Sequence, residues 1–121
     1  PENKRIPGLL ILRPESPIVY FNVQNIMDAV RALLDKRTGI RRVVMDMSVV
    51  NYIDDSGSMA MVDLARGLRR EGIDLKLTDT LSEVRDMLRK QGMEEITGHL
   101  SRQYDTHDAV MEFRALKKDH Y

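Results

Sequence analysis

The chain has 121 residues, of which 42% are hydrophobic and 31% charged, so it can form one compact core but not two ordinary domains. Nineteen basic residues balance nineteen acidic ones, which removes the basic excess typical of nucleic-acid-binding proteins. Cysteine is absent, which excludes disulfides, thiolate zinc sites and cysteine nucleophiles. The longest apolar stretches fall far short of the roughly 18 to 20 residues that span a bilayer.

The first third of the chain predicts two strands and one helix. Apolar runs at 9–12 and 18–21 flank the proline-containing segment 13–17, and this arrangement is typical of a hairpin. Thr38 and Gly39 then follow a predicted helix. Its apolar residues recur at helical spacing, at Ile26, Ala29, Val30, Leu33 and Leu34.

The middle of the chain alternates between strands and helices. Residues 42–47 are β-branched at their centre and too few for a helix, which predicts a buried central strand. A helix follows the segment 54–57, with apolar residues at Met61, Leu64, Ala65 and Leu68. Residues 73–77 alternate between apolar and polar, as does a strand with one covered face.

The last third predicts two more helices. Thr80 with Glu83 three residues later forms a capping box for the first of them. A short strand near Ile96 is expected between the two helices, and Thr106 is expected to cap the last one. Its charged end, residues 116–121, is expected to fray.

The order of elements predicts an α/β fold with parallel strand pairs. We expect a mixed central sheet of four to five strands and about four helices. The polar residues 1–5 are expected to be a linker remnant, and residues 6–121 a single domain. Because the chain begins at Pro1 and shows no leader pattern, we expect it to be trimmed or part of a longer protein.

The junction of the central strand and the following helix is the main candidate site. Sites in parallel α/β sheets form where strands end and helices begin. Asp54 or Asp55 can cap the helix, while Ser56 and Ser58 lie where free backbone N–H groups favour anions. A phosphate on Ser56 would be attracted by the helix and repelled by the neighbouring carboxylates. A well-capped helix start with no further role is the alternative interpretation.

The residue pattern gives little support to an enzyme. Asp46, Asp54 and Asp55 resemble the acidic set of a phosphoacceptor receiver, but such a site needs acidic residues after the first strand, where Arg13 and Pro14 stand. The three histidines lack metal-ligand spacing, and no phosphate loop or nucleophile elbow is present. We expect no catalytic residue, no metal and no cofactor.

The chain resembles a STAS domain. The resemblance rests on the opening Pro7–Pro17 (PGLLILRPESP), on Tyr20–Asn22, and on Asp54–Gly57 (DDSG) between the central strand and the next helix. The opening is most similar to the cytoplasmic C-terminal STAS domain of SulP-family sulfate and anion transporters. The resemblance covers nearly the whole chain.

The resemblance implies a regulatory and protein-interaction domain of a SulP-type transporter, on the cytoplasmic side of the (inner) cell membrane. The implied partners are the membrane portion of its own transporter, a protein at the surface from Asp54 to Met61, and a second copy in a homodimer, but no nucleic acid. The implied switch position is Ser56, and partner or anion contacts are expected at the helix start. The residues concerned are Asp54, Asp55, Gly57, Ser58 and Met59.

The related anti-sigma-factor antagonists offer a second hypothesis. In these soluble signalling proteins a partner kinase phosphorylates the serine that corresponds to Ser56. Asp55 departs from the small residue found in many of them, and its negative charge disfavours a phosphate beside it. A free-standing antagonist therefore remains the alternative to a transporter domain, and an enzyme that uses Asp46, Asp54 and Asp55 is the third hypothesis.

Overall fold

The computed structural model of the chain describes residues 6–120. The linker predicted at residues 1–5, and Tyr121 in the predicted frayed end, lie outside the described residues. The strands in the described part are β1 (Leu9–Leu12), β2 (Arg42–Asp46) and β3 (Asp74–Thr78). They form one parallel sheet in the order β1-β2-β3. In the register Leu10 lies opposite Val43, and Val43 lies opposite Leu75.

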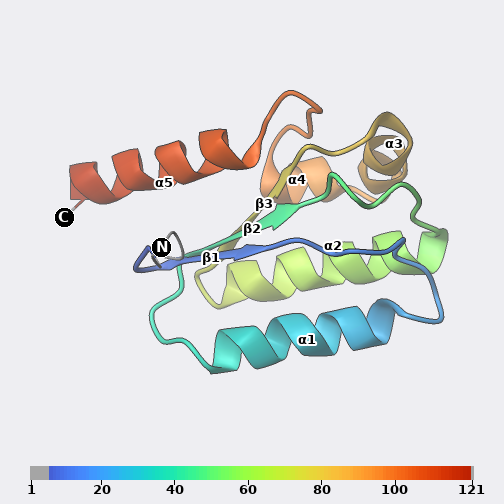
Figure 1. Cartoon of the computed structure of the whole chain (residues 1–121), viewed down its shortest axis with the longest axis horizontal. Coiled ribbons are helices and arrows are strands. Elements are labelled where there is room, and N and C mark those ends of the chain that lie inside the picture. The colour runs from blue at the N-terminus through green and yellow to red at the C-terminus, as the bar shows by residue number, and fades with distance from the viewer. Residues whose placement is uncertain (1–5, 121) are drawn as a thin grey trace.

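Helices cover both faces of this sheet (Figure 1). Those in the described part are α1 (Val23–Asp35), α2 (Asp55–Arg70), α3 (Ser82–Lys90), α4 (Met93–Thr97) and α5 (Thr106–His120). α1 and α2 lie on one face and α5 on the other. None of these helices is both long and apolar enough to span a bilayer.

The alternation of side chains along the strands divides the core into two parts. Leu10, Val43 and Met45 belong to a large cluster shared with α1, α2 and α3. Leu9 and Val44, which point to the opposite face, belong to a small cluster with residues of α5, namely Ala109 and Phe113. α5 is therefore attached through a much smaller apolar contact than the helices on the other face.

The predicted α/β class is confirmed. Within residues 6–120 the sheet has three strands, all parallel, and not the four to five strands of a mixed sheet, and five helices are present where about four were expected. The predicted hairpin is wrong. Ile18 makes a single parallel bridge to Ile53, and the chain then turns into α1 at Val23. The prolines at positions 14 and 17 and the turn after Val19 leave too few residues to form a ladder.

Two predictions in the last third are also corrected. The segment near Ile96 is the short helix α4, because Gly92 ends the preceding turn at φ 87° and Met93 and Thr97 then bury one helical face. Thr80 does not cap α3. That helix begins at Ser82, with Leu81 at the capping position, and Thr80 is buried.

The caps and ends of the other helices differ from the sequence-based expectation in detail. The side chain of Asp105 accepts a hydrogen bond from the backbone N–H of Asp108 at 2.8 Å and so caps α5. Thr106 instead pairs its hydroxyl with that of Thr78 at 3.0 Å. α5 continues to His120 through most of the end that was expected to fray. On α1, Ala29 and Leu33 are exposed although the predicted apolar stripe included them.

The parallel arrangement gives the domain two distinct ends. All three strands begin, and α1, α2 and α5 finish, at one end, which we call the amino end of the sheet (Figure 1). The strands finish and α2 begins at the other end, the carboxyl end of the sheet. Because α2 has 16 residues, the two ends are separated by about 24 Å along this helix.

Candidate functional site

Asp54 joins two segments at the carboxyl end of the sheet. One carboxylate oxygen accepts a hydrogen bond from the backbone N–H of Gly57 at 2.7 Å and caps α2. The other accepts from the backbone N–H of Tyr20 at 3.0 Å. The prediction that one of the two aspartates caps the helix is therefore confirmed for Asp54. Asp54 also holds the backbone of Tyr20, 34 residues away. The helix-capping pattern did not predict this second hydrogen bond.

Gly57 is required by the close approach of the segment around Ile18. A Cβ atom at position 57 would lie 2.2 Å from the Ile18 carbonyl oxygen, far inside contact distance. This carbonyl is fixed because it accepts from the Asp54 N–H at 3.3 Å, while the Ile18 N–H donates to the Tyr52 carbonyl at 3.1 Å. The glycine thus lets the first turn of α2 pack directly on the chain that leads into α1.

The predicted contact residues divide into an exposed and a buried set. Asp55, Ser56 and Met59 are exposed at the start of α2, and Asp54 is half-buried. Gly57 and Ser58 are buried, and the Ser58 hydroxyl donates to the Asp55 carbonyl at 3.0 Å. Because Gly57 and Ser58 are buried, they offer no side chain to a partner. The candidate contact residues at the start of α2 are therefore Asp55, Ser56 and Met59.

Three aromatic residues beside this set were not predicted as contacts. Tyr20 and Phe21 are 72% and 73% exposed, and Tyr52 is 56% exposed. The first two rings meet edge to face with centroids 5.5 Å apart. Their segment is joined to the start of α2 by the bonds of Asp54 and Ile18. We call the group the α2 surface, and its members are Tyr20, Phe21, Tyr52, Asp55, Ser56 and Met59.

The turn that carries these aromatic rings is held by Asn22. Its side-chain oxygen accepts from the Val19 N–H at 2.9 Å, and its amide donates to the Pro17 carbonyl at 2.8 Å. The exposed rings therefore stand on a segment whose backbone is fixed from both sides. Large exposed apolar side chains on a fixed backbone are typical of protein interaction sites.

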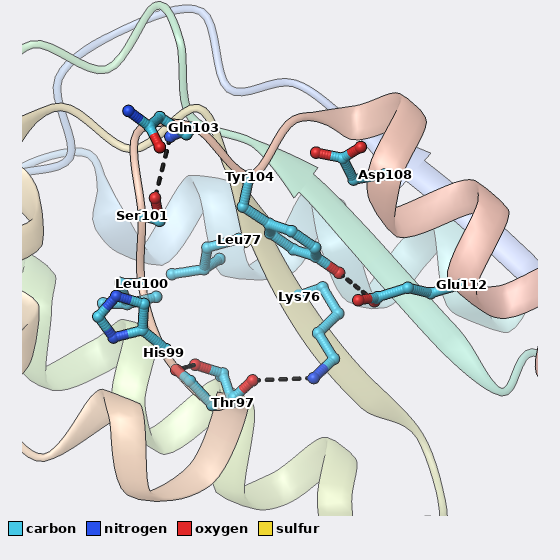
Figure 2. A pocket seen from close by; sticks show the side chains of 11 residues that line it. Lys76, Leu77, Thr97, His99, Leu100, Ser101, Gln103, Tyr104, Asp108 and Glu112 are labelled. Atoms are coloured by element: carbon cyan, nitrogen blue, oxygen red, sulfur yellow. Dashed lines mark hydrogen bonds between the residues drawn. The ribbon is translucent and has the colours of Figure 1, made fainter.

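A cleft of about 450 Å³ lies elsewhere, between β3, α5 and the connection from α4 to α5 (Figure 2). Two hydrogen bonds join polar groups of its lining. The Lys76 ammonium donates to the Thr97 carbonyl at 3.0 Å, and the Tyr104 hydroxyl donates to the Glu112 carboxylate. Burial and this hydrogen bond raise the pKa of the Tyr104 phenol, so the ring keeps its proton at neutral pH. The bond between Tyr104 and Glu112 joins the α4–α5 connection to α5 across the cleft.

Two of the three acidic residues considered for catalysis, Asp46 and Asp54, hold backbone N–H groups through their side chains. One Asp46 oxygen accepts from the Ser48 N–H at 2.9 Å, and Asp54 holds two backbone N–H groups. Within residues 6–120, no group of three or more His, Asp or Glu side chains is arranged to hold a metal ion.

Comparison with protein families gives a match over most of the chain. Residues 1–109 match the model described as the STAS domain. Curated relatives include the probable sulfate transporters 3.4 and 4.2 of Arabidopsis thaliana, each 32% identical to this chain. The matches cover 80% and 91% of this chain but 16% and 18% of the relatives. The chain therefore spans less than a fifth of their length.

Solved structures share the fold. The murine Solute Carrier 26 family member A9 anion transporter, in its inward-facing state, matches with a TM-score of 0.78 and 24% identity, over 93% of this chain and 18% of the transporter. A sulfate transporter family protein from Wolinella succinogenes matches with a TM-score of 0.74 and 18% identity, over 98% of this chain and 96% of that chain.

Proposed function

The chain belongs to the STAS domain family, and we propose that it is the cytoplasmic, C-terminal regulatory domain of a SulP-type transporter of sulfate or a related small anion. The observation that carries the proposal is the similarity to a limited part of proteins named as sulfate transporters. The anion path would lie in a membrane portion outside this chain. The named relatives are transporters, which points to a non-enzymatic role for the chain.

The α2 surface is the proposed site of regulation, with Ser56 as the switch position. A phosphate there would add about two negative charges beside Asp55, on the same surface as the exposed aromatic rings. Such a change weakens an apolar contact through desolvation and repulsion. Exposed aromatic residues contribute strongly to protein interfaces, so the partner would present a complementary apolar surface.

The position of this surface supports a soluble partner in preference to the membrane portion. The α2 surface lies at the carboxyl end of the sheet (Figure 1). Ile6, the first residue that the structure describes, lies at the amino end, where its carbonyl accepts from the Leu9 N–H at the start of β1 at 3.0 Å. The two are separated by the length of α2. If residues 1–5 follow a membrane portion, the α2 surface faces away from the bilayer.

The proposal predicts where the protein is found in the source cells. We expect an antibody against this chain to detect a membrane-bound species several times larger than 14.0 kDa. A soluble band near 14.0 kDa would contradict the transporter assignment. It would instead favour a free-standing anti-sigma-factor antagonist, for which phosphate on Ser56 becomes the next measurement.

Ser56→Glu tests the switch directly. The side chain is exposed in the first turn of α2, where a carboxylate is compatible with the helix dipole, so we expect unfolding free energy to change by less than about 0.5 kcal/mol. Partner binding or anion uptake by the longer protein should change by about tenfold. Ser82→Glu is the matched control, since Ser82 is also exposed in the first turn of a helix. No change in either assay, or an equal change in the control, would remove the switch.

A further inference from the structure

The two ends of the domain carry opposite charge although the whole chain is neutral. At the amino end of the sheet, segments 6–8, 35–42, 69–74 and 114–117 hold eight basic and three acidic residues. At the carboxyl end, segments 13–22, 46–55, 78–82 and 101–108 hold two basic and seven acidic residues, not counting His107. The formal charges of these two groups of segments are therefore +5 and −5.

The acidic residues at the amino end are already paired. Glu71 accepts two hydrogen bonds from Arg31, at 2.7 and 3.2 Å, and Asp35 lies 3.9 Å from the same guanidinium. Asp74 is paired with the buried Arg42 at 3.0 Å. The three local carboxylates are thus paired with two arginines, and basic residues outnumber acidic ones at this end.

Besides Arg42, seven basic residues lie at this end, in three stretches of the chain. Lys36, Arg41, Arg69, Arg70 and Arg114 are exposed, whereas Arg37 and Lys117 are half-buried and donate to the Leu9 carbonyl at 2.8 Å and the Pro7 carbonyl at 3.1 Å. Cations in the last turn of a helix also stabilise that helix, which accounts for some of them. The parallel arrangement brings these helix ends and the strand starts to one end of the sheet, with α1 and α2 on one face and α5 on the other (Figure 1).

We propose that the amino end of the sheet docks on the anionic headgroups of the bilayer. Ile6 lies at this end, where the Arg37 guanidinium donates to its carbonyl at 3.4 Å. A preceding membrane portion would therefore hold this end close to the membrane. Basic clusters beside a membrane anchor bind acidic phospholipids electrostatically. The position of this end beside a membrane rests on the proposed transporter function. The attraction to anionic headgroups rests only on the excess of basic residues at this end.

Vesicle sedimentation with the 121-residue chain tests the proposal. We expect the chain to bind phosphatidylcholine vesicles that contain phosphatidylserine, and not vesicles of phosphatidylcholine alone. Arg69→Gln with Arg70→Gln should weaken this binding by about twenty-five-fold, since each cation near such a surface contributes about fivefold. Raising the salt concentration should also release the chain.

The matched control removes two cations from the opposite end, through Arg13→Gln with Arg102→Gln, so that both double variants have the same net charge. Binding of the control should equal that of the unmodified chain. Equal losses in both variants, or no preference for phosphatidylserine, would overturn the proposal. Binding to polyglutamate but not to vesicles would also overturn it and point to an acidic protein. The transporter assignment is tested separately, because cell fractionation does not depend on vesicle binding.

Discussion

Replacing Gly57 with alanine should lower the free energy of unfolding by about 3 kcal/mol, which is a large loss for a domain of this size. The added Cβ would stand 2.2 Å from the Ile18 carbonyl oxygen and 3.1 Å from the Ile53 side chain. The carbonyl belongs to a backbone fixed by hydrogen bonds to Asp54 and Tyr52. Relief therefore requires a shift of α2 or loss of these bonds, and urea denaturation measures the cost.

Gly67→Ala is the control for this prediction, since both glycines lie in α2. A Cβ at position 67 would meet no atom within 4 Å. We expect this variant to be more stable than the unmodified chain by about 1 kcal/mol, because alanine is the better helix former. If both Gly57→Ala and Gly67→Ala are more stable than the unmodified chain, the contact between Gly57 and the Ile18 carbonyl leaves room for a Cβ atom, and the prediction is wrong.

The same contact explains why the α2 surface keeps a fixed shape. Asp54 accepts from both α2 and the segment of Tyr20, and Gly57 allows the two to touch. A surface held in this way loses little conformational entropy when a partner binds. In Gly57→Ala the segment that carries Tyr20 and Phe21 should therefore separate from α2. We expect this separation even if α2 remains helical in the variant.

The sequence was sufficient to predict elements whose residues pack in one regular pattern. The apolar residues of α2, Met61, Ala65 and Leu68, are buried as their spacing predicts. β3 buries Leu75 and Leu77 and leaves Asp74 exposed, as its alternation predicts. The sequence also narrowed the cap of α2 to Asp54 or Asp55, because capping is a local interaction between residues three positions apart.

Features that depend on distant contacts could not be predicted in this way. Residues 18–21 are apolar, and a local pattern does not distinguish a strand from a turn that exposes two rings. The turn is held by the local bonds of Asn22 and by the bond from the Tyr20 N–H to Asp54, 34 residues away. Likewise, net charge contains no information on position, so the separation of charge between the two ends becomes visible only once the strands are aligned.

The second large effect is expected at Arg42, which attaches α5 to the sheet. Its side chain is buried, with 3% of the residue exposed. The guanidinium donates to Asp74 at 3.0 Å, to Glu112 at 3.3 Å and to the Ala109 carbonyl at 3.0 Å. It also lies 5.8 Å from the centroid of the Phe113 ring. Since the apolar cluster beneath α5 is small, these bonds contribute much of the attachment.

Arg42→Ala should therefore lower the free energy of unfolding by about 3 kcal/mol. Asp74 and Glu112 are about half exposed, so water can hydrate their carboxylates in the variant. The loss then arises mainly from the detachment of α5. Hydrogen exchange should accelerate in α5 and remain slow in α2, because local opening follows the weakened contact.

Arg31→Ala is the control for Arg42→Ala. It shows how much stability is lost when an exposed ion pair is removed. Arg31 makes a two-pronged contact with Glu71, but both side chains are nearly half exposed, and such pairs contribute less than about 1 kcal/mol. Arg42→Met is a further variant that retains most of the buried apolar volume. If Arg42→Met is as stable as the unmodified chain, packing and not charge attaches α5. If Arg42→Ala and Arg31→Ala lose equal stability, Arg42 has no special role in holding the helix.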